Sequence, residues 1–152
     1  MSNINKIIDK SILVIGDVML DVYYSGDVGR ISPEAPVPVF RKHAERHVLG
    51  GAANVAANLL AAEQKVSLLS VVGNDEAGRK LLDILAEKKI NNSLVSVIPR
   101  KTTVKTRFMA NNNQQVMRLD VEDAENLSAE ICAQLLDRQH RLAQAPYTDL
   151  PA

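Results

Sequence analysis

Short apolar runs alternate with helical patterns along the chain, and their order predicts an α/β protein. The run SILVIGD at 11–17 is rich in apolar residues and ends in Gly-Asp, which is typical of a strand buried on both faces of a parallel sheet. The predicted strands are 11–17, 65–73, 93–98, 102–110 and 114–120, with an asparagine turn at 111–113, and the predicted helices are 51–63, 75–89 and 128–143. We therefore expect a parallel-centred sheet with right-handed crossovers.

The stretch 22–39 interrupts this alternation. It contains Pro33, Pro36 and Pro38, which exclude a helix and restrict any strand to a sheet edge or a loop. We expect an irregular β-excursion that stands away from the main sheet.

The last predicted helix, 128–143, has Ser128 as its N-cap. Its amphipathic pattern turns Ile131, Leu135 and Leu136 toward the core. Cys132 is the single cysteine, so it cannot form an internal disulfide, and we expect it to be a small buried hydrophobe.

The composition excludes several classes of partner. The 152 residues suit one domain or a piece of a larger one. Eighteen basic and eighteen acidic residues cancel, so no global field favours nucleic acid or an anionic membrane. The apolar run near the N-terminus is too short for a signal peptide or a membrane span, and we expect a cytoplasmic protein. The spacing of the histidines predicts no metal site.

Two carboxylates follow the first predicted strand, at the end where open parallel sheets bind ligands. Asp17 comes directly after the strand and Asp21 four residues later. Ionised carboxylates accept several hydrogen bonds and would suit the hydroxyls of a polyol. A turn in which Asp17 binds its own backbone explains the pattern equally well, so both interpretations stay open.

The segment LGGAAN at 49–54 also has two interpretations. Gly50 and Gly51 would let a ligand approach the backbone, and Asn54 would add an amide from the first helical turn. A glycine turn that lets the helix lie close to the sheet is the simpler alternative. Neither a dinucleotide fingerprint nor a P-loop occurs in the sequence.

Basic residues gather on two of the predicted strands. Alternation places Lys105 and Arg107 on one face, and Arg118 lies on the following strand. They are candidates for binding a phosphate, since the arginine fork supplies paired donors. Solvated charges at a sheet edge are the alternative.

Several of these stretches together resemble one family, the ribokinase-like (PfkB) carbohydrate kinases. The resemblance extends from about residue 11 to about residue 125, and more narrowly it is to heptose 7-phosphate kinase domains of ADP-heptose synthesis. It is carried by GDVMLDVYYSGDVGRISPEAPVPVF, GGAANVAANL, VVGNDEAG and TVKTRFMANNNQQVMRLDVED. It implies a three-layer αβα sandwich with a protruding β-lid at about 22–49, of which residues 1–152 would be the N-terminal portion.

The resemblance also implies an activity, namely ATP- and Mg²⁺-dependent phosphorylation of D-glycero-β-D-manno-heptose 7-phosphate at C1, for the lipopolysaccharide core. It assigns the sugar hydroxyls to Asp17, Asp21, Gly50, Gly51 and Asn54, and it places the run 105–120 beside the sugar. Arg107 or Arg118 is then a candidate for the 7-phosphate. Lids of two subunits would pack together as a homodimer, and lid closure would exclude water from phosphoryl transfer.

One feature departs from the family pattern. The sequence contains no GAGD-type segment, whose aspartate is the catalytic base in the family, and it lacks most of the ATP-binding elements. We therefore expect a truncated domain that is inactive as a kinase on its own. The alternatives are a non-catalytic sugar-binding or dimerisation module, and a fragment of another PfkB sugar kinase, which RISPEAPVPV disfavours.

Overall fold

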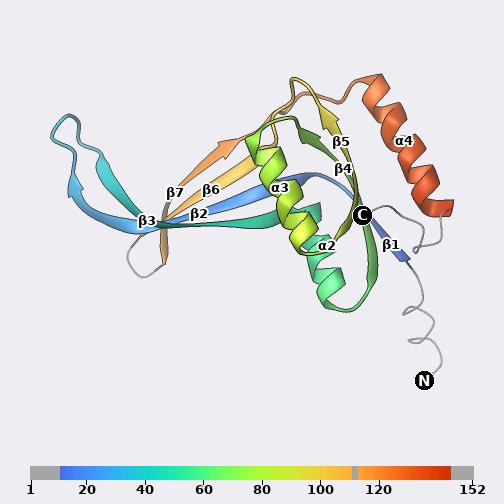
Figure 1. The fold of residues 1–152 in the computed structure, drawn as a ribbon. Coiled ribbons are helices and arrows are strands. Elements are labelled where there is room, and N and C mark those ends of the chain that lie inside the picture. The colour runs from blue at the N-terminus through green and yellow to red at the C-terminus, as the bar shows by residue number, and fades with distance from the viewer. Residues whose placement is uncertain (1–10, 111–112, 145–152) are drawn as a thin grey trace.

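The computed structural model describes residues 11–110 and 113–144, which form two sheets and three helices (Figure 1). The first sheet has the order β1-β4-β5 and contains β1 (Ser11–Ile15), β4 (Lys65–Gly73) and β5 (Asn91–Val97). The second has the order β3-β2-β6-β7 and contains β2 (Val18–Ile31), β3 (Pro38–Gly51), β6 (Thr103–Ala110) and β7 (Gln114–Val121). The helices are α2 (Ala52–Ala61), α3 (Glu76–Glu87) and α4 (Ala129–Gln144).

The first sheet is the parallel core that the sequence predicts. Strand β4 pairs in parallel with both β1 and β5. Its residues 66–70 are all buried, because helices cover both faces of the central strand. Helices α2 and α3 supply the main core with Ala53, Ala56, Leu81 and Leu85, while α4 contacts β4 and β5. The expected α/β class and its layered arrangement are confirmed.

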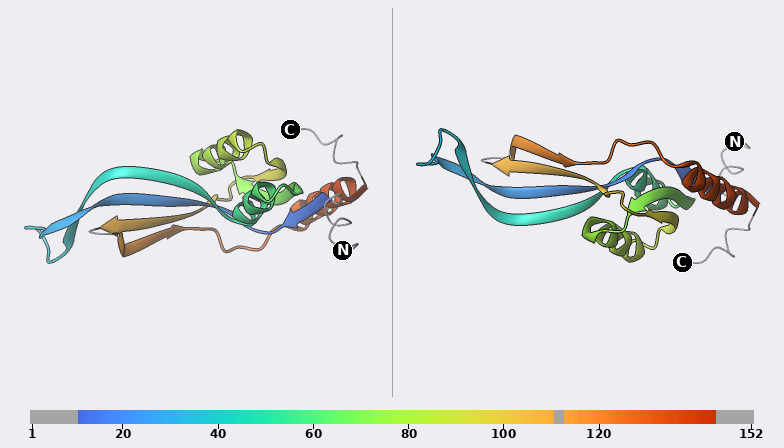
Figure 2. Two further views of the ribbon diagram at one scale, coloured as in Figure 1. Left: turned by 90° about the horizontal axis from the view of Figure 1, so that it is seen from below. Right: turned by 90° about the horizontal axis from the view of Figure 1, so that it is seen from above.

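The second sheet projects from this core as a long arm, which we call the lid (Figure 2). Strands β2 and β3 pair over 14 residues each, and Pro33 and Pro36 lie in the turn between them. Pro38 opens β3, which is an edge strand, where a missing N–H is tolerated. The excursion does stand away from the main sheet as predicted. The expected irregularity is present as two register shifts in the β2–β3 pairing, at Ser25/Gly26 and at Val28/Arg30, although β2 itself is an interior strand of the sheet.

The lid is larger than the predicted 22–49. It takes in 18–51 and also 103–121, because β2 pairs in parallel with β6 and β6 pairs with β7. Burial of Val18, Leu20 and Val22 on alternate positions fixes the register of β2 against the core. Part of the predicted turn at 111–113 lies outside the described residues.

Both predicted helix caps are confirmed. Asp75 accepts a hydrogen bond from the Gly78 N–H at 2.8 Å, and Ser128 accepts one from the Ile131 N–H at 3.3 Å. The predicted orientation of α4 is only partly right. Ile131 and Leu135 are half-buried, but Leu136 is 65% exposed and Cys132 is exposed.

The row of α4 that faces the sheet continues to Arg138 rather than to Leu136. Arg138 donates a hydrogen bond to the Leu94 carbonyl at 2.9 Å, which orients the helix with Cys132 and Leu136 outward. Within residues 11–110 and 113–144, no helix is long and apolar enough to cross a membrane.

Candidate functional site

One face of the lid carries most of the predicted polar site residues. Because Leu20 and Val22 of β2 turn toward the core, Asp21 and its alternate neighbours turn to the opposite face. Cross-strand pairing adds residues from the adjacent strands to this face. We call it the polar lid face, and it comprises Met19, Asp21, Tyr23, Arg46, Lys105, Arg107, Arg118 and Asp120.

An ion pair joins β2 to β6 on this face. The Arg107 Nη1 atom lies 2.5 Å from Oδ1 of Asp21, and the two side chains are only 23% and 18% exposed. Asp21 pairs in register with Lys105, so Arg107 reaches Asp21 from two residues further along β6, on the same face. The hydrogen bond to Asp21 raises the pKa of Arg107 above its ordinary value. Two residues predicted as separate candidates are therefore direct partners.

The other two predicted cations share one carboxylate. Asp120 lies 3.2 Å from the Lys105 Nζ and 2.9 Å from the Arg118 Nε. Burial raises the pKa of Asp120, but the hydrogen bonds from Lys105 and Arg118 outweigh this effect and leave its pKa below the ordinary value. Lys105 also lies 3.7 Å from Glu122. These contacts hold Lys105 against the face, where its side chain is 21% exposed, whereas the Arg118 side chain is 51% exposed.

Asp17 lies at the inner end of the polar lid face. Its carbonyl accepts a hydrogen bond from the Ala52 N–H at 2.9 Å, and the residue is exposed. A cavity of about 430 Å³ opens here, with Asp17, Thr103 and Lys105 on one side and the segment 122–127 on the other. Its size suits a small polar ligand such as a sugar.

The two glycines lie against the predicted aspartates. A Cβ on Gly50 would come within 2.7 Å of Oδ2 of Asp21, and a Cβ on Gly51 within 2.3 Å of the Asp17 carbonyl oxygen. Gly51 also has a φ of +57°. The packing interpretation of these glycines is therefore supported by the protein's own contacts. Access for a ligand stays a prediction, as does the role of Asn54, which is exposed in the first turn of α2.

Sequence reasoning missed Tyr23 and Arg46. They pair directly across β2 and β3, and the Arg46 guanidinium lies 4.6 Å from the centre of the Tyr23 ring. The Arg107 guanidinium lies 5.3 Å from the same centre. The alternation of Leu20, Asp21, Val22 and Tyr23 was the available signal, but it can be interpreted only when 18–51 is recognised as a β-hairpin.

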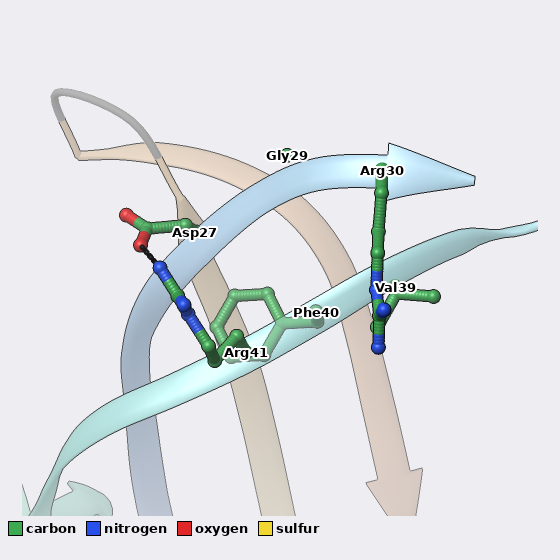
Figure 3. Close-up of a pocket in the computed structure, with 6 residues that line it drawn as sticks. All are labelled: Asp27, Gly29, Arg30, Val39, Phe40 and Arg41. Atoms are coloured by element: carbon green, nitrogen blue, oxygen red, sulfur yellow. Dashed lines mark hydrogen bonds and ion pairs between the residues drawn. The ribbon is translucent and has the colours of Figure 1, made fainter. Parts of the chain in front are cut away.

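A second cavity, of about 520 Å³, lies at the outer end of the lid hairpin and contains none of the predicted site residues (Figure 3). Arg41 reaches across from β3 to Asp27, with an Nη2 to Oδ2 distance of 3.1 Å, beside the Phe40 ring. His43 also contacts Asp27, at 2.6 Å. The hydrogen bonds from His43 and Arg41 keep the pKa of Asp27 below its ordinary value. This cluster crosslinks the two strands.

The described part of the chain does not assemble a metal centre. In residues 11–110 and 113–144, no three His, Cys, Asp or Glu side chains come together to hold an ion. The carboxylates of the polar lid face are engaged with arginine and lysine instead. The side chains of this face are carboxylates, which accept hydrogen bonds from hydroxyl groups, and guanidinium and ammonium groups, which donate them to anions.

Comparison with known proteins points to carbohydrate kinases. The chain matches the model of the pfkB family of carbohydrate kinases over residues 9–145. It is 46% identical over 129 residues to the bifunctional protein HldE of Helicobacter pylori and 45% identical over 130 residues to the D-beta-D-heptose 7-phosphate kinase of Bordetella bronchiseptica. The alignments cover 84% and 82% of this chain but 28% and 41% of those relatives. The chain thus spans less than half the length of either.

Solved structures agree on the fold. The chain is similar to a carbohydrate kinase from Agrobacterium tumefaciens, with a TM-score of 0.59 at 18% identity over 74% of this chain and 35% of that one. It is also similar to the nucleoside kinase of Methanocaldococcus jannaschii, an archaeal member of the ribokinase family, with a TM-score of 0.55 at 24% identity over 73% and 36% of the two chains. At these identities the likeness establishes the fold alone.

Proposed function

This chain belongs to the pfkB family of carbohydrate kinases, and we propose that it forms the sugar-binding and lid portion of a heptose 7-phosphate kinase of ADP-heptose synthesis. The family activity would be the transfer of the γ-phosphoryl group of ATP to the C1 hydroxyl of the sugar. Residues 1–152 would constitute one continuous portion of that kinase domain. Its setting would be cytoplasmic.

The observation that carries this proposal is that carboxylate and guanidinium side chains lie together on one face of the lid. Asp17 and Asp21 lie at its inner end, and Arg107 contacts Asp21 at 2.5 Å. Carboxylates accept hydrogen bonds from sugar hydroxyls, and guanidinium groups bind phosphate through paired donors. A site for a sugar phosphate needs both a carboxylate and a guanidinium group, close enough together for one molecule to contact both.

Each site residue then has a role. Asp17 and Asp21 would accept hydrogen bonds from ring hydroxyls, and Asn54 would contribute an amide from the first turn of α2. Gly50 and Gly51 would keep the backbone close to the aspartates and to the ligand. Lys105 would lie at the cavity wall, and Arg107 or Arg118 would bind the 7-phosphate. When bound, ATP would supply the phosphoryl group, while these residues orient the acceptor and the lid excludes water.

We further propose that two copies associate through their lids. The face of the lid opposite the polar lid face carries Met117 and Leu119, each 51% exposed, and Val121, 38% exposed. Tyr24 and Phe40 pack edge-on against Phe108 on the same outer part of the lid, with ring centres 5.3 and 5.2 Å apart. An apolar surface of this kind favours association.

Binding and turnover separate the candidate functions. Calorimetric titration of the 152-residue chain with heptose 7-phosphate should show binding that Asp21→Asn weakens about 10- to 100-fold, since a hydrogen bond to a charged group contributes about 1.5 to 3 kcal/mol. Asp27→Asn is the matched control, because Asp27 is also an ion-paired aspartate of β2 but lies on the outer hairpin. Ribose and fructose as competing ligands test the alternative of another sugar kinase.

A coupled assay with ATP tests the catalytic part. We expect binding without turnover from the 152 residues alone, because their sequence has no GAGD-type segment. Turnover would show that the chain is catalytically sufficient and overturn that expectation. Absence of heptose 7-phosphate binding, with the chain folded, would refute the proposed function.

A further inference from the structure

A row of arginines crosses the lid one step outward from the aspartates. Tyr23 pairs in register with Arg46 on one side and with Arg107 on the other, and Arg107 pairs with Arg118. The four residues therefore occupy the four strands of the sheet in order, on the polar lid face. We call them the basic row.

Tyr23 sets the geometry of the two inner arginines. The guanidinium carbon of Arg46 lies 4.6 Å from the centre of its ring and that of Arg107 lies 5.3 Å from it. Such cation–π contacts orient guanidinium groups without using their N–H donors. Both groups therefore keep N–H donors for hydrogen bonds to an anion, although Arg107 already donates one hydrogen bond to Asp21.

The charges of the row are unequally compensated. Arg107 is paired with Asp21, and Arg118 with Asp120. For Arg46, no carboxylate of residues 11–110 or 113–144 lies within ion-pair distance. Like charges directly across a sheet, such as Arg107 and Arg118, destabilise the pairing. A bound anion would relieve this repulsion.

The aspartates of the polar lid face lie inward of the arginines along the strands, with Lys105 between Asp21 and Asp120. The row that contains Asp21 and Lys105 lies two residues inward from the basic row, a displacement of roughly 7 Å along β2. Asp17 lies further inward still, at the end of β1. A ligand that spans both rows would place its hydroxyls inward and an anionic group outward.

We propose that Arg46 is a phosphate-binding residue, and that Arg46 and Arg107, held on either side of Tyr23, bind the phosphate of a sugar phosphate whose hydroxyls contact Asp17 and Asp21. This inference rests on the proposed function and deepens it. It fixes the orientation of the ligand, with the phosphate on the outer lid and the opposite end of the sugar at β1. It also makes strand β3 a contributor to recognition of the phosphate, which sequence reasoning placed on 105–120 alone.

Three ligands and three variants test this assignment. Heptose 7-phosphate, the unphosphorylated heptose and inorganic phosphate are titrated into the 152-residue chain and into Arg46→Ala, Arg46→Lys and Arg41→Ala. Arg46 is exposed, so its replacement leaves the core intact, and circular dichroism verifies the fold. Arg41 is the matched control, because it is an exposed arginine of β3 on the outer hairpin (Figure 3).

We expect Arg46→Ala to weaken heptose 7-phosphate binding about 10-fold or more and to leave binding of the heptose unchanged, since a charge-assisted hydrogen bond is lost only for the phosphate. Arg46→Lys should recover part of the affinity, because lysine restores the charge without the fork. Arg41→Ala should bind as the unmodified chain does.

The outcomes distinguish the two proposals. Unchanged affinity of Arg46→Ala for heptose 7-phosphate overturns the role of Arg46 and leaves the proposed function standing. Equal losses for the phosphorylated and unphosphorylated sugars also overturn it. Binding of inorganic phosphate that depends on Arg46, without binding of the heptose phosphate, supports the basic row and refutes the proposed substrate. Binding of neither ligand refutes both.

Discussion

Replacement of Asp75 should detach the start of lid strand β6 from the core. The Asp75 carboxylate accepts hydrogen bonds from the Gly78 N–H at 2.8 Å, from the Thr102 N–H at 2.8 Å and from the Thr102 hydroxyl at 2.7 Å. Thr102, 1% exposed, also accepts a hydrogen bond from the Gly73 N–H at 3.0 Å. One side chain thus caps α3 and fixes the residue that precedes β6.

The magnitude follows from these contacts. Loss of an N-cap costs about 1 kcal/mol, and each hydrogen bond to a charged group contributes about 1.5 to 3 kcal/mol, with incomplete additivity. Asp75 is only half-buried, so water can replace part of the loss. We expect Asp75→Ala to lower the free energy of unfolding by about 2 to 4 kcal/mol, or about 5 to 15 °C in Tm.

Urea denaturation followed by circular dichroism measures this change. Asp83→Ala is the control, because Asp83 is an exposed aspartate of the same helix α3, and it should change stability by less than about 0.5 kcal/mol. Asp75→Asn should lower the free energy of unfolding by an amount between those for Asp75→Ala and Asp83→Ala, since its amide keeps one acceptor oxygen. A loss from Asp75→Ala no larger than that from Asp83→Ala would refute the structural role of Asp75.

The same contacts predict a dependence on pH. Burial raises the pKa of Asp75, but the hydrogen bonds from Thr102 and Gly78 outweigh this effect and leave its pKa below the ordinary value. A lowered folded-state pKa stabilises the fold above the unfolded-state pKa of about 3.9, and this stabilisation is lost as pH falls through the folded-state pKa. The stability difference between the unmodified chain and Asp75→Asn should therefore shrink below about pH 4. A difference independent of pH would contradict the assignment.

Three further predictions concern other parts of the molecule. Gly51→Ala should destabilise the fold by about 1 to 3 kcal/mol in thermal unfolding. Its Cβ would lie 2.3 Å from the Asp17 carbonyl oxygen, and the residue has a φ of +57°. Gly29→Ala is the control and should leave stability unchanged, because no atom lies within 4 Å of the added Cβ. Leu119→Glu should dissociate the proposed lid dimer in sedimentation experiments, while Val55→Glu, at an exposed apolar position of α2, should not. Arg138→Ala should cost about 1 to 3 kcal/mol in denaturation, because the Leu94 carbonyl loses its donor.

The parallel core could be predicted from sequence because its signals are local. Strand β4 is a mainly apolar run that is buried almost throughout, and α3 has both a cap and core spacing. The observed bounds of β4 are the predicted ones, and those of α3 differ from the prediction by one residue at the start and two at the end. The buried face of helix α4 was harder to predict, because Ile131 and Leu136 lie on different faces of the helix. Only the contact of Arg138 with β5 determines which row faces the sheet.

The lid could not be predicted in the same way, because its structure depends on pairing between distant segments. The prolines of 33–38 restricted any strand there to a sheet edge or a loop, and they do occupy the hairpin turn and the first position of an edge strand, but they gave no register for the hairpin. Once that turn is placed, the register brings Arg46 opposite Tyr23 and Arg107 beside it. Asp21, Lys105, Arg107 and Arg118 were therefore visible as candidates in the sequence, but Tyr23, Arg46 and the spatial order of these residues were not.

The glycine pair was given two interpretations, close packing of the helix and access for a ligand, and the contact of Gly50 with Asp21 makes them compatible. A Cβ on Gly50 would come within 2.7 Å of the Asp21 carboxylate, and Asp21 is the partner of Arg107. The absence of a side chain at position 50 consequently leaves room for the carboxylate that pairs with Arg107. A side chain at position 50 would displace Asp21 and with it the charge balance of the basic row. Close packing and the proposed recognition of the sugar would thus depend on the same atoms, which is why the sequence pattern alone could not separate them.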